Sequence, residues 1–212
     1  MNKRTFSTKE IVVIGMFSAI STVLMLLDFP LPFAPSFYKF DFSDVAALIV
    51  GFAFGPFAGV MVEFIKVVLN VLIQGTSSAF VGEIANFVIG ASFVVVASII
   101  YRFNKTRKGA LIGSLVATLF IAFIGAALNA YFMIPAYALM FGGEDVIISA
   151  GTAIYPFVDN IFTFCLVCVA PFNLVKGILH SVVTFAIYKQ ISPILKTGNV
   201  APRRKNRAVV EQ

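Results

Sequence analysis

Six apolar segments fill most of the 212-residue chain and leave few folds open to it. They are expected at residues 11–27, 44–55, 57–73, 80–101, 109–133 and 160–189. A helix needs about 20 apolar residues to cross the hydrocarbon core of a bilayer, and all but the second run approach or exceed that length. A helix also satisfies its own backbone hydrogen bonds, which lipid cannot do. The sequence therefore predicts an all-α integral membrane protein.

Charged residues make up only 12% of the sequence, against about 25% in soluble domains. One membrane domain at residues 1–212 is expected, with a helical core at 8–195 and a basic tail at 196–212. The first apolar run is too long for a secretory signal peptide and lacks a small-residue cleavage site, so it should remain as an anchor. The net charge of +6 reflects orientation in the membrane. The basic tail is expected to meet anionic lipid headgroups, and nucleic acid is not an expected partner.

The basic residues predict the topology. Most of the 16 lysines and arginines form three clusters: Lys3, Arg4 and Lys9; Arg102, Lys105, Arg107 and Lys108; and Lys189, Lys196, Arg203, Arg204, Lys205 and Arg207. Such clusters normally lie in the cytoplasm. The first two can share a side only if the region 44–73 crosses twice, with a break at Gly55 and Pro56, which end helices. Six transmembrane helices with cytoplasmic N- and C-termini follow.

The remaining loops, 28–43, 74–79 and 134–159, should then lie outside. Their charges are mostly acidic, because they hold Asp28, Asp41, Glu144, Asp145 and Asp159 against Lys39. The first outer loop is rich in proline and aromatic residues, which suggests either a lid that caps a pocket or an interfacial aromatic belt. The helix after it has about 12 residues, too few to cross alone, so it should be tilted, shielded or extended by flanking chain.

Several polar side chains fall inside the predicted helices. In the stretch PFNLVKGILH, Asn173, Lys176 and His180 share one helix face. A lysine at the middle of a membrane helix costs about 2.5–3.5 kcal/mol, so such residues face a partner or a cavity. The polar edge of a bound ligand is a candidate partner for Lys176. His180 lies one turn further toward the cytoplasm and should be a buried hydrogen-bonding residue.

Other polar residues are expected near the outer ends of two neighbouring helices. Glu83 and Asn86 lie one turn apart on the fourth helix, and Asn129 lies on the fifth, followed by Tyr131 and Phe132. A single membrane asparagine often only joins helices. Together with Asn173 and Lys176, these groups suggest a cavity for a planar, polar small molecule, in which Tyr131 and Phe132 supply stacking surface.

Two further patterns have both structural and functional interpretations. Glu63 and Lys66 are one turn apart and opposite in charge, which favours a structural ion pair over a ligand-binding role. The first helix carries a stripe of small residues, Gly15, Ser18, Ala19 and Thr22. Small residues let helices approach closely, either inside the bundle or against a separate protein.

Cys165 and Cys168 are expected to be reduced, buried packing residues.

The usual signatures of catalysis are missing. The sequence has no GxxxxGK[ST] run for ATP hydrolysis, and it has one histidine with no HExxH or GxSxG. The chain is therefore not expected to be an enzyme, and no metal or cofactor is expected.

Four stretches resemble a known family: YKFDFSDVAALIVGFAFGPFAGVMVEFIK (Tyr38–Lys66), VGEIANFVIG (Val81–Gly90), LNAYFMIPAY (Leu128–Tyr137) and APFNLVKG (Ala170–Gly177). In these stretches the chain is similar to the substrate-binding S components of energy-coupling factor (ECF) vitamin transporters, particularly their riboflavin-specific (RibU) group. The resemblance implies riboflavin binding from outside, in an occluded pocket made by the first loop and helices 4 to 6. FMN or another vitamin is the alternative ligand, and a membrane enzyme or assembly factor the alternative class.

The resemblance also assigns residues. It implies that Asn129, Asn173 and Lys176 contact the flavin, and that Tyr38, Lys39, Asp41, Glu83 and Asn86 support it or form the lid. Helix 1 should dock onto a shared transmembrane subunit that carries two ABC-type ATPases. The family's docking signature is an alanine pair spaced by three residues, and here Gly15 and Ala19 occupy those positions.

Overall fold

The computed structural model describes residues 6–197. The helices are α1 (Thr8–Leu26), α2 (Ser43–Phe54), α3 (Pro56–Gln74), α4 (Val81–Phe103), α5 (Arg107–Leu128), α6 (Ile134–Phe141), α7 (Glu144–Thr152), α8 (Ile161–Phe164) and α9 (Ala170–Thr197). Two π-helical turns, η1 (Asn129–Met133) and η2 (Cys165–Val169), join α5 to α6 and α8 to α9. Strands β1 (Phe29–Pro30) and β2 (Lys39–Phe40) pair antiparallel in the first loop. The predicted basic tail lies almost entirely outside the described residues.

The predicted break in the region 44–73 is confirmed. Gly55 ends α2 with a backbone φ of +100°, which residues other than glycine rarely adopt. Pro56 then begins α3. The long helices are also confirmed, because five stretches are long and apolar enough to cross a membrane. The twelve-residue α2 is shorter.

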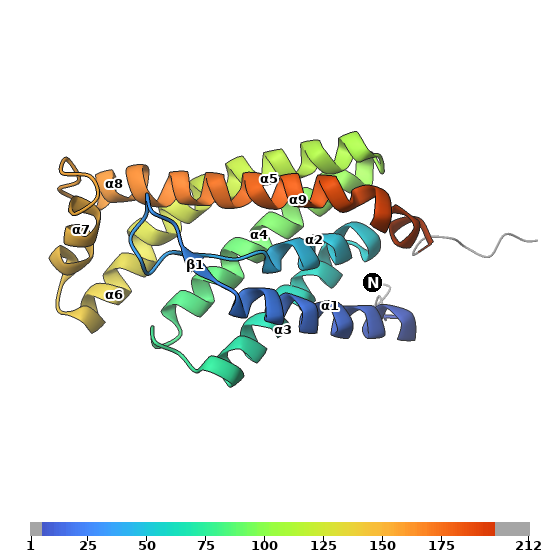
Figure 1. Cartoon of the computed structure of the whole chain (residues 1–212), viewed down its shortest axis with the longest axis horizontal. Helices are drawn as coiled ribbons and strands as arrows, with labels where there is room; N and C mark the ends of the chain where they lie inside the picture. Colours follow the sequence, from blue (N-terminus) through green and yellow to red (C-terminus); the bar gives the residue numbers. More distant parts are fainter. Residues whose placement is uncertain (1–5, 198–212) are drawn as a thin grey trace, which may run out of the picture.

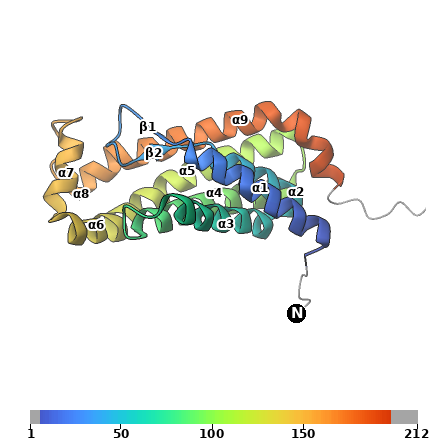
Figure 2. The same cartoon turned by 60° about the horizontal axis from the view of Figure 1, so that its bottom comes forward.

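Every residue of α2 is buried. The helix is enclosed by α1, α3, α4 and α9 (Figures 1 and 2). Its backbone and side chains therefore meet protein on all sides, which explains how a helix too short to span lipid alone is tolerated. Of the expected solutions, shielding by neighbouring helices is the one observed.

The segment 134–159 is not the loop that was predicted between the last two apolar segments. It contains α6 and α7, and α6 continues α5 through η1, so that one apolar stretch runs from Arg107 to Met140. In Figure 1 these helices and α8 gather at one end of the bundle.

Each π-helical turn lies just before a proline. η1 ends two residues before Pro135, and η2 ends two residues before Pro171. A proline inside a helix has no N–H to donate and its ring clashes with the carbonyl four residues earlier. The wider turn accommodates both effects, and it widens the helices next to Asn129 and Asn173.

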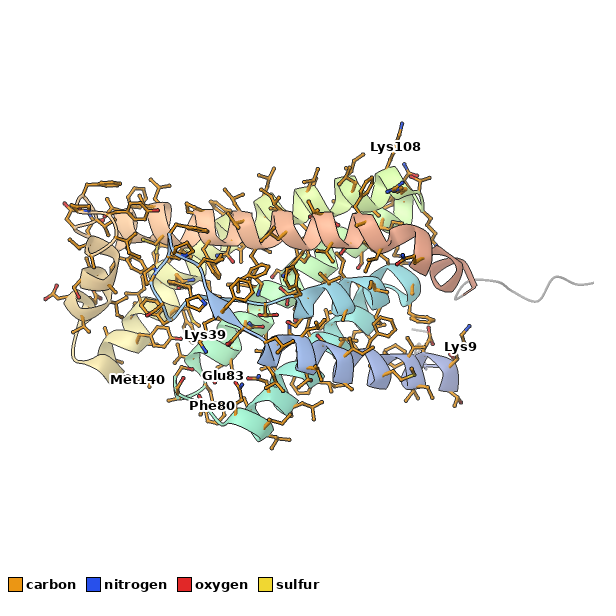
Figure 3. All side chains as sticks on the ribbon, in the orientation of Figure 1. Lys9, Lys39, Phe80, Glu83, Lys108 and Met140 are labelled. Carbon is orange, nitrogen blue, oxygen red and sulfur yellow. The ribbon has the colours of Figure 1, made fainter. Side chains whose placement is uncertain are left out.

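Basic residues of two different helices, α1 and α5, lie at the same end of the bundle (Figure 3). Figure 3 shows Lys9 and Lys108 at the end where α1 begins, and Lys39, Glu83 and Met140 toward the other end. Many large apolar side chains on the outer surface are exposed, Leu139 and Phe123 among them. A surface of this kind is expected where the bundle meets lipid acyl chains.

The small-residue stripe on α1 divides between two faces. Ser18 and Thr22 are buried, whereas Gly15 and Ala19 are exposed. A Cβ added to Gly15 would meet no atom within 4 Å. Internal packing therefore accounts for Ser18 and Thr22, and only Gly15 and Ala19 remain on a free surface.

Candidate ligand-binding site

A cavity of about 120 Å³ lies between the first loop and α4, η1, α6 and α9. Its walls combine amides, two lysines and aromatic rings: Phe37, Tyr38, Lys39, Gly82, Ala85, Asn86, Ile89, Asn129, Met133, Tyr137, Phe172, Asn173 and Lys176. Six of the predicted site residues are among them: Tyr38, Lys39, Asn86, Asn129, Asn173 and Lys176. The cavity thus brings together predicted site residues that lie up to 138 positions apart in the chain, from Tyr38 to Lys176.

Asn129 and Asn173 enter the cavity in the same way. Their exposed fractions are 3% and 2%, and each donates from Nδ2 to the carbonyl four residues earlier, Gly125 at 2.8 Å and Val169 at 3.0 Å. These bonds fix both amides against their own helices and turn each Oδ1 away from the backbone partner. The two helices therefore present a pair of amide oxygens that can accept hydrogen bonds.

Tyr38 covers one of these oxygens. Its hydroxyl donates to Asn129 Oδ1 at 2.6 Å, and its ring lies 5.4 Å from that of Phe172. Removal from water raises the pKa of Tyr38 well above its usual value, so the phenol stays protonated and able to donate. The first loop is thus anchored to the cavity by one hydrogen bond and by aromatic packing.

Asn86 contributes an acceptor without a partner. Its Oδ1 is buried and accepts no hydrogen bond from any residue in the range 6–197. A buried acceptor that is left unsatisfied costs about 1–3 kcal/mol. A ligand that donates a hydrogen bond at this point would remove that cost.

Lys176 is buried but its charge is compensated within the protein. Its Nζ lies 3.1 Å from Asp44 Oδ2 and 3.9 Å from Asp41 Oδ2. Asp44 also contacts the ammonium group of Lys66, which lies 2.7 Å from Glu63 Oε2. The predicted ion pair of Glu63 and Lys66 is therefore confirmed, and it belongs to a larger buried cluster. Among the described residues the closest acidic partner of Lys176 is Asp44, which the sequence interpretation did not name, and the ligand's polar edge remains a predicted second partner.

His180 and Asp41 lie beneath the cavity and do not line it. The Nε2 of His180 is 2.8 Å from the backbone carbonyl oxygen of Asp41, and the imidazole is fully buried. This confirms His180 as a buried hydrogen-bonding residue. The carboxylate of Asp41 accepts the backbone N–H of Ser43 at 2.7 Å, so it holds the start of α2.

Two predicted site residues point elsewhere. Tyr131 is 86% exposed and faces away from the cavity. Tyr131 lies two positions after Asn129 in the same helical turn, so the two side chains point to nearly opposite sides of the helix and cannot both face inward. Glu83 is not among the lining residues, and its carboxylate instead accepts from the Ser78 hydroxyl at 2.6 Å.

Sequence reasoning missed the residues that replace them. Tyr137, Phe172 and Phe37 supply the aromatic walls. Asp44 had a detectable signal, because it is a carboxylate in the first turn of a helix that is otherwise apolar, while Lys176 had no acidic partner on its own helix. Charges buried in a membrane protein normally pair with one another.

The chain is similar to known membrane transport proteins. The profile of the family described as "ECF transporter, substrate-specific component" matches residues 9–188. The riboflavin transporter RibU of Staphylococcus aureus (strain TCH60) is 34% identical over 89% of this chain and 93% of its own length. The riboflavin transporter FmnP of Bacillus subtilis (strain 168) is 35% identical over 87% of this chain and 93% of its own length. A solved structure, described as "Structure and mechanism of the S component of a bacterial ECF transporter", superposes with a TM-score of 0.69 at 34% identity, over 89% of this chain and 98% of that one.

Proposed function

Because the chain belongs to the substrate-specific components of ECF transporters, we propose that its cavity binds riboflavin. The protein is a multi-pass cell membrane protein and a transport component, not an enzyme. The observation that carries the proposal is the convergence of Asn86, Asn129, Asn173 and Lys176 on one aromatic-walled cavity. Its relatives in Staphylococcus aureus and Bacillus subtilis are named riboflavin transporters.

Riboflavin suits these walls chemically. Its ring system is planar, and one edge carries alternating carbonyl acceptors and an N–H donor. Amide oxygens can accept from that N–H, the ammonium of Lys176 can donate to a ring carbonyl, and Phe172 and Tyr137 offer flat apolar surface. The ribityl hydroxyls can use the remaining amide groups.

The compensated lysines favour riboflavin over its phosphate ester FMN. Lys39 lies 3.1 Å from Asp28 Oδ1, and Lys176 lies 3.1 Å from Asp44 Oδ2. A phosphate bound at either lysine would compete with a carboxylate already in place. The site therefore has no uncompensated cation among its lining residues.

The proposal includes the orientation of the protein in the membrane. All six apolar segments, α2 included, cross the membrane, with both termini in the cytoplasm and the first loop as an outer lid. Lys9 and Lys108 lie at the same end of the bundle (Figure 3), which supports this orientation because basic residues concentrate on the cytoplasmic side. Riboflavin then enters from outside, at the end where Lys39 lies.

Delivery needs partners, because the sequence contains no ATP-binding loop. The exposed pair Gly15 and Ala19 on α1 is the docking surface for the transmembrane subunit, to which two ABC-type ATPases are attached. Small residues on an exposed helix face suit close contact with another membrane helix.

Riboflavin titration of the purified protein tests the proposal. We expect saturable quenching of flavin fluorescence at one riboflavin per chain, with FMN competing less effectively and thiamine not at all. Tighter binding of FMN than of riboflavin would reassign the ligand, and binding of neither flavin would refute the proposal.

Gly125 offers a test of the cavity geometry. A Cβ at this position would lie 2.6 Å from Asn173 Nδ2, so Gly125→Ala must displace the Asn173 amide. We expect riboflavin binding to weaken about 10-fold, the loss of roughly one hydrogen bond, measured by fluorescence titration. Gly15→Ala is the matched control, because a Cβ there meets nothing. Equal affinities for both variants would argue against Asn173 as a ligand contact.

A further inference from the structure

The carboxylate of Asp44 is the centre of the buried charge cluster below the cavity. Its Oδ2 lies 3.1 Å from Lys176 Nζ and 3.4 Å from His180 Nδ1, while Oδ1 contacts Lys66 Nζ and lies 3.4 Å from Ser43 Oγ. Asp44 itself does not line the cavity, whereas Lys176 does. One carboxylate thus connects three helices, α2, α3 and α9.

The side of Asp44 that faces away from Lys176 is held rigidly. Lys66 is bound at the same time by Asp44, by Ser43 Oγ at 2.8 Å and by Glu63 at 2.7 Å. Ser43 is in turn tied to α1, because the Ser21 hydroxyl donates to its carbonyl at 2.8 Å. With α2 buried along its whole length, the Asp44 carboxylate has one fixed position.

Lys176, in contrast, has a long side chain with many rotamers. Of the acidic groups in the described part of the chain, only Asp44 and Asp41 lie within 4.0 Å of its Nζ, and Asp44 is closer by 0.8 Å. An ammonium group has three N–H donors. The bond to Asp44 uses one of them and thereby sets the direction of the others, toward the cavity that Lys176 lines.

We propose that Asp44 is a positioning residue for ligand binding, which holds the ammonium group of Lys176 at the cavity wall. This role rests on the proposed function, since it concerns how the same site binds its flavin. Through Asp44, Lys176 becomes a directed donor to a neutral acceptor such as a ring carbonyl. Without Asp44, the ammonium group has no fixed direction and its buried charge is left with the more distant Asp41.

A double-mutant cycle on riboflavin affinity tests this role. We expect Lys176→Met to weaken binding about 30-fold, and Asp44→Asn about 10-fold, as loss of a charged hydrogen bond and of its orientation would do. In the double variant, Asp44→Asn should add almost nothing to Lys176→Met, because Asp44 acts through Lys176. A merely structural Asp44 would instead give losses that multiply, to about 300-fold.

Two further variants distinguish a specific effect on ligand binding from a folding defect. Glu63→Gln removes a partner of Lys66 but leaves Lys176 untouched, so it should lower thermal stability and preserve riboflavin affinity. Asp44→Glu keeps the charge while moving the carboxylate, and it replaces Asp44→Asn in the cycle if that variant does not purify as a monodisperse protein. Multiplying losses, or weakened binding in Glu63→Gln, would overturn the role of Asp44. Absence of riboflavin binding in the wild type would instead refute the proposed function, and the role of Asp44 would fall with it.

Discussion

Replacing Ala19 with tryptophan should abolish riboflavin uptake and leave riboflavin binding unchanged. Ala19 is exposed on α1, and neither it nor Gly15 lines the cavity. The helix is held to the bundle through its other face, where Ile14, Ser18 and Thr22 are buried. A tryptophan at position 19 therefore leaves the fold intact but prevents a partner helix from approaching closely.

The measurement pairs two assays on the same variant. Uptake of labelled riboflavin is followed in cells that lack other riboflavin transporters and express the ECF subunits, and affinity is measured on purified protein. Leu119→Trp is the matched control, because Leu119 is exposed on α5, away from α1. Uptake that persists in Ala19→Trp would show that α1 is not the docking surface. Lost affinity in a folded protein would place α1 in the binding site.

The second large effect is expected from the paired amides. The double variant Asn129→Ala/Asn173→Ala should lose about 1,000-fold in riboflavin affinity, because each amide contributes roughly 30-fold and the two lie on different helices. Among residues 6–197 the two amides bond only to their own helix backbones and to Tyr38, so their removal should not unfold the bundle. Isothermal titration of the purified variant measures the loss.

Asn70→Ala is the control for that double variant. Asn70 is also a buried membrane asparagine, but it lies on α3 and does not line the cavity. Its replacement should leave the affinity unchanged. An affinity of the double variant within about 10-fold of the wild type would mean that the asparagines serve only to join helices.

The long apolar helices and the break at Gly55–Pro56 were accessible from the sequence, because hydropathy and backbone breaks act locally. The break is a single backbone conformation with φ of +100°, and it follows directly from the residue types. For the segment with α6 and α7 the sequence predicts a loop, because its apolar content is interrupted by glycines and acidic residues at Gly142 to Asp145.

The candidate site was predictable only in part. Asn129, Asn173 and Lys176 stand out because polar groups are costly in lipid. The outward direction of Tyr131 follows from helix rotation and was overlooked. The partnership of Asp44 with Lys176 depends on how α2 crosses α9, which no local pattern encodes. Likewise, the two π-helical turns follow from the prolines only once the helices are known to continue past them.

Mass spectrometry of the ligand that copurifies with the protein tests the central claim most directly. The protein is purified from cells grown with riboflavin, beside the Asn129→Ala/Asn173→Ala variant. Binding in this cavity predicts a yellow wild-type protein that releases riboflavin at close to one molecule per chain, and a variant that carries none. A colourless wild-type protein, a different vitamin, or equal riboflavin in both proteins would contradict it.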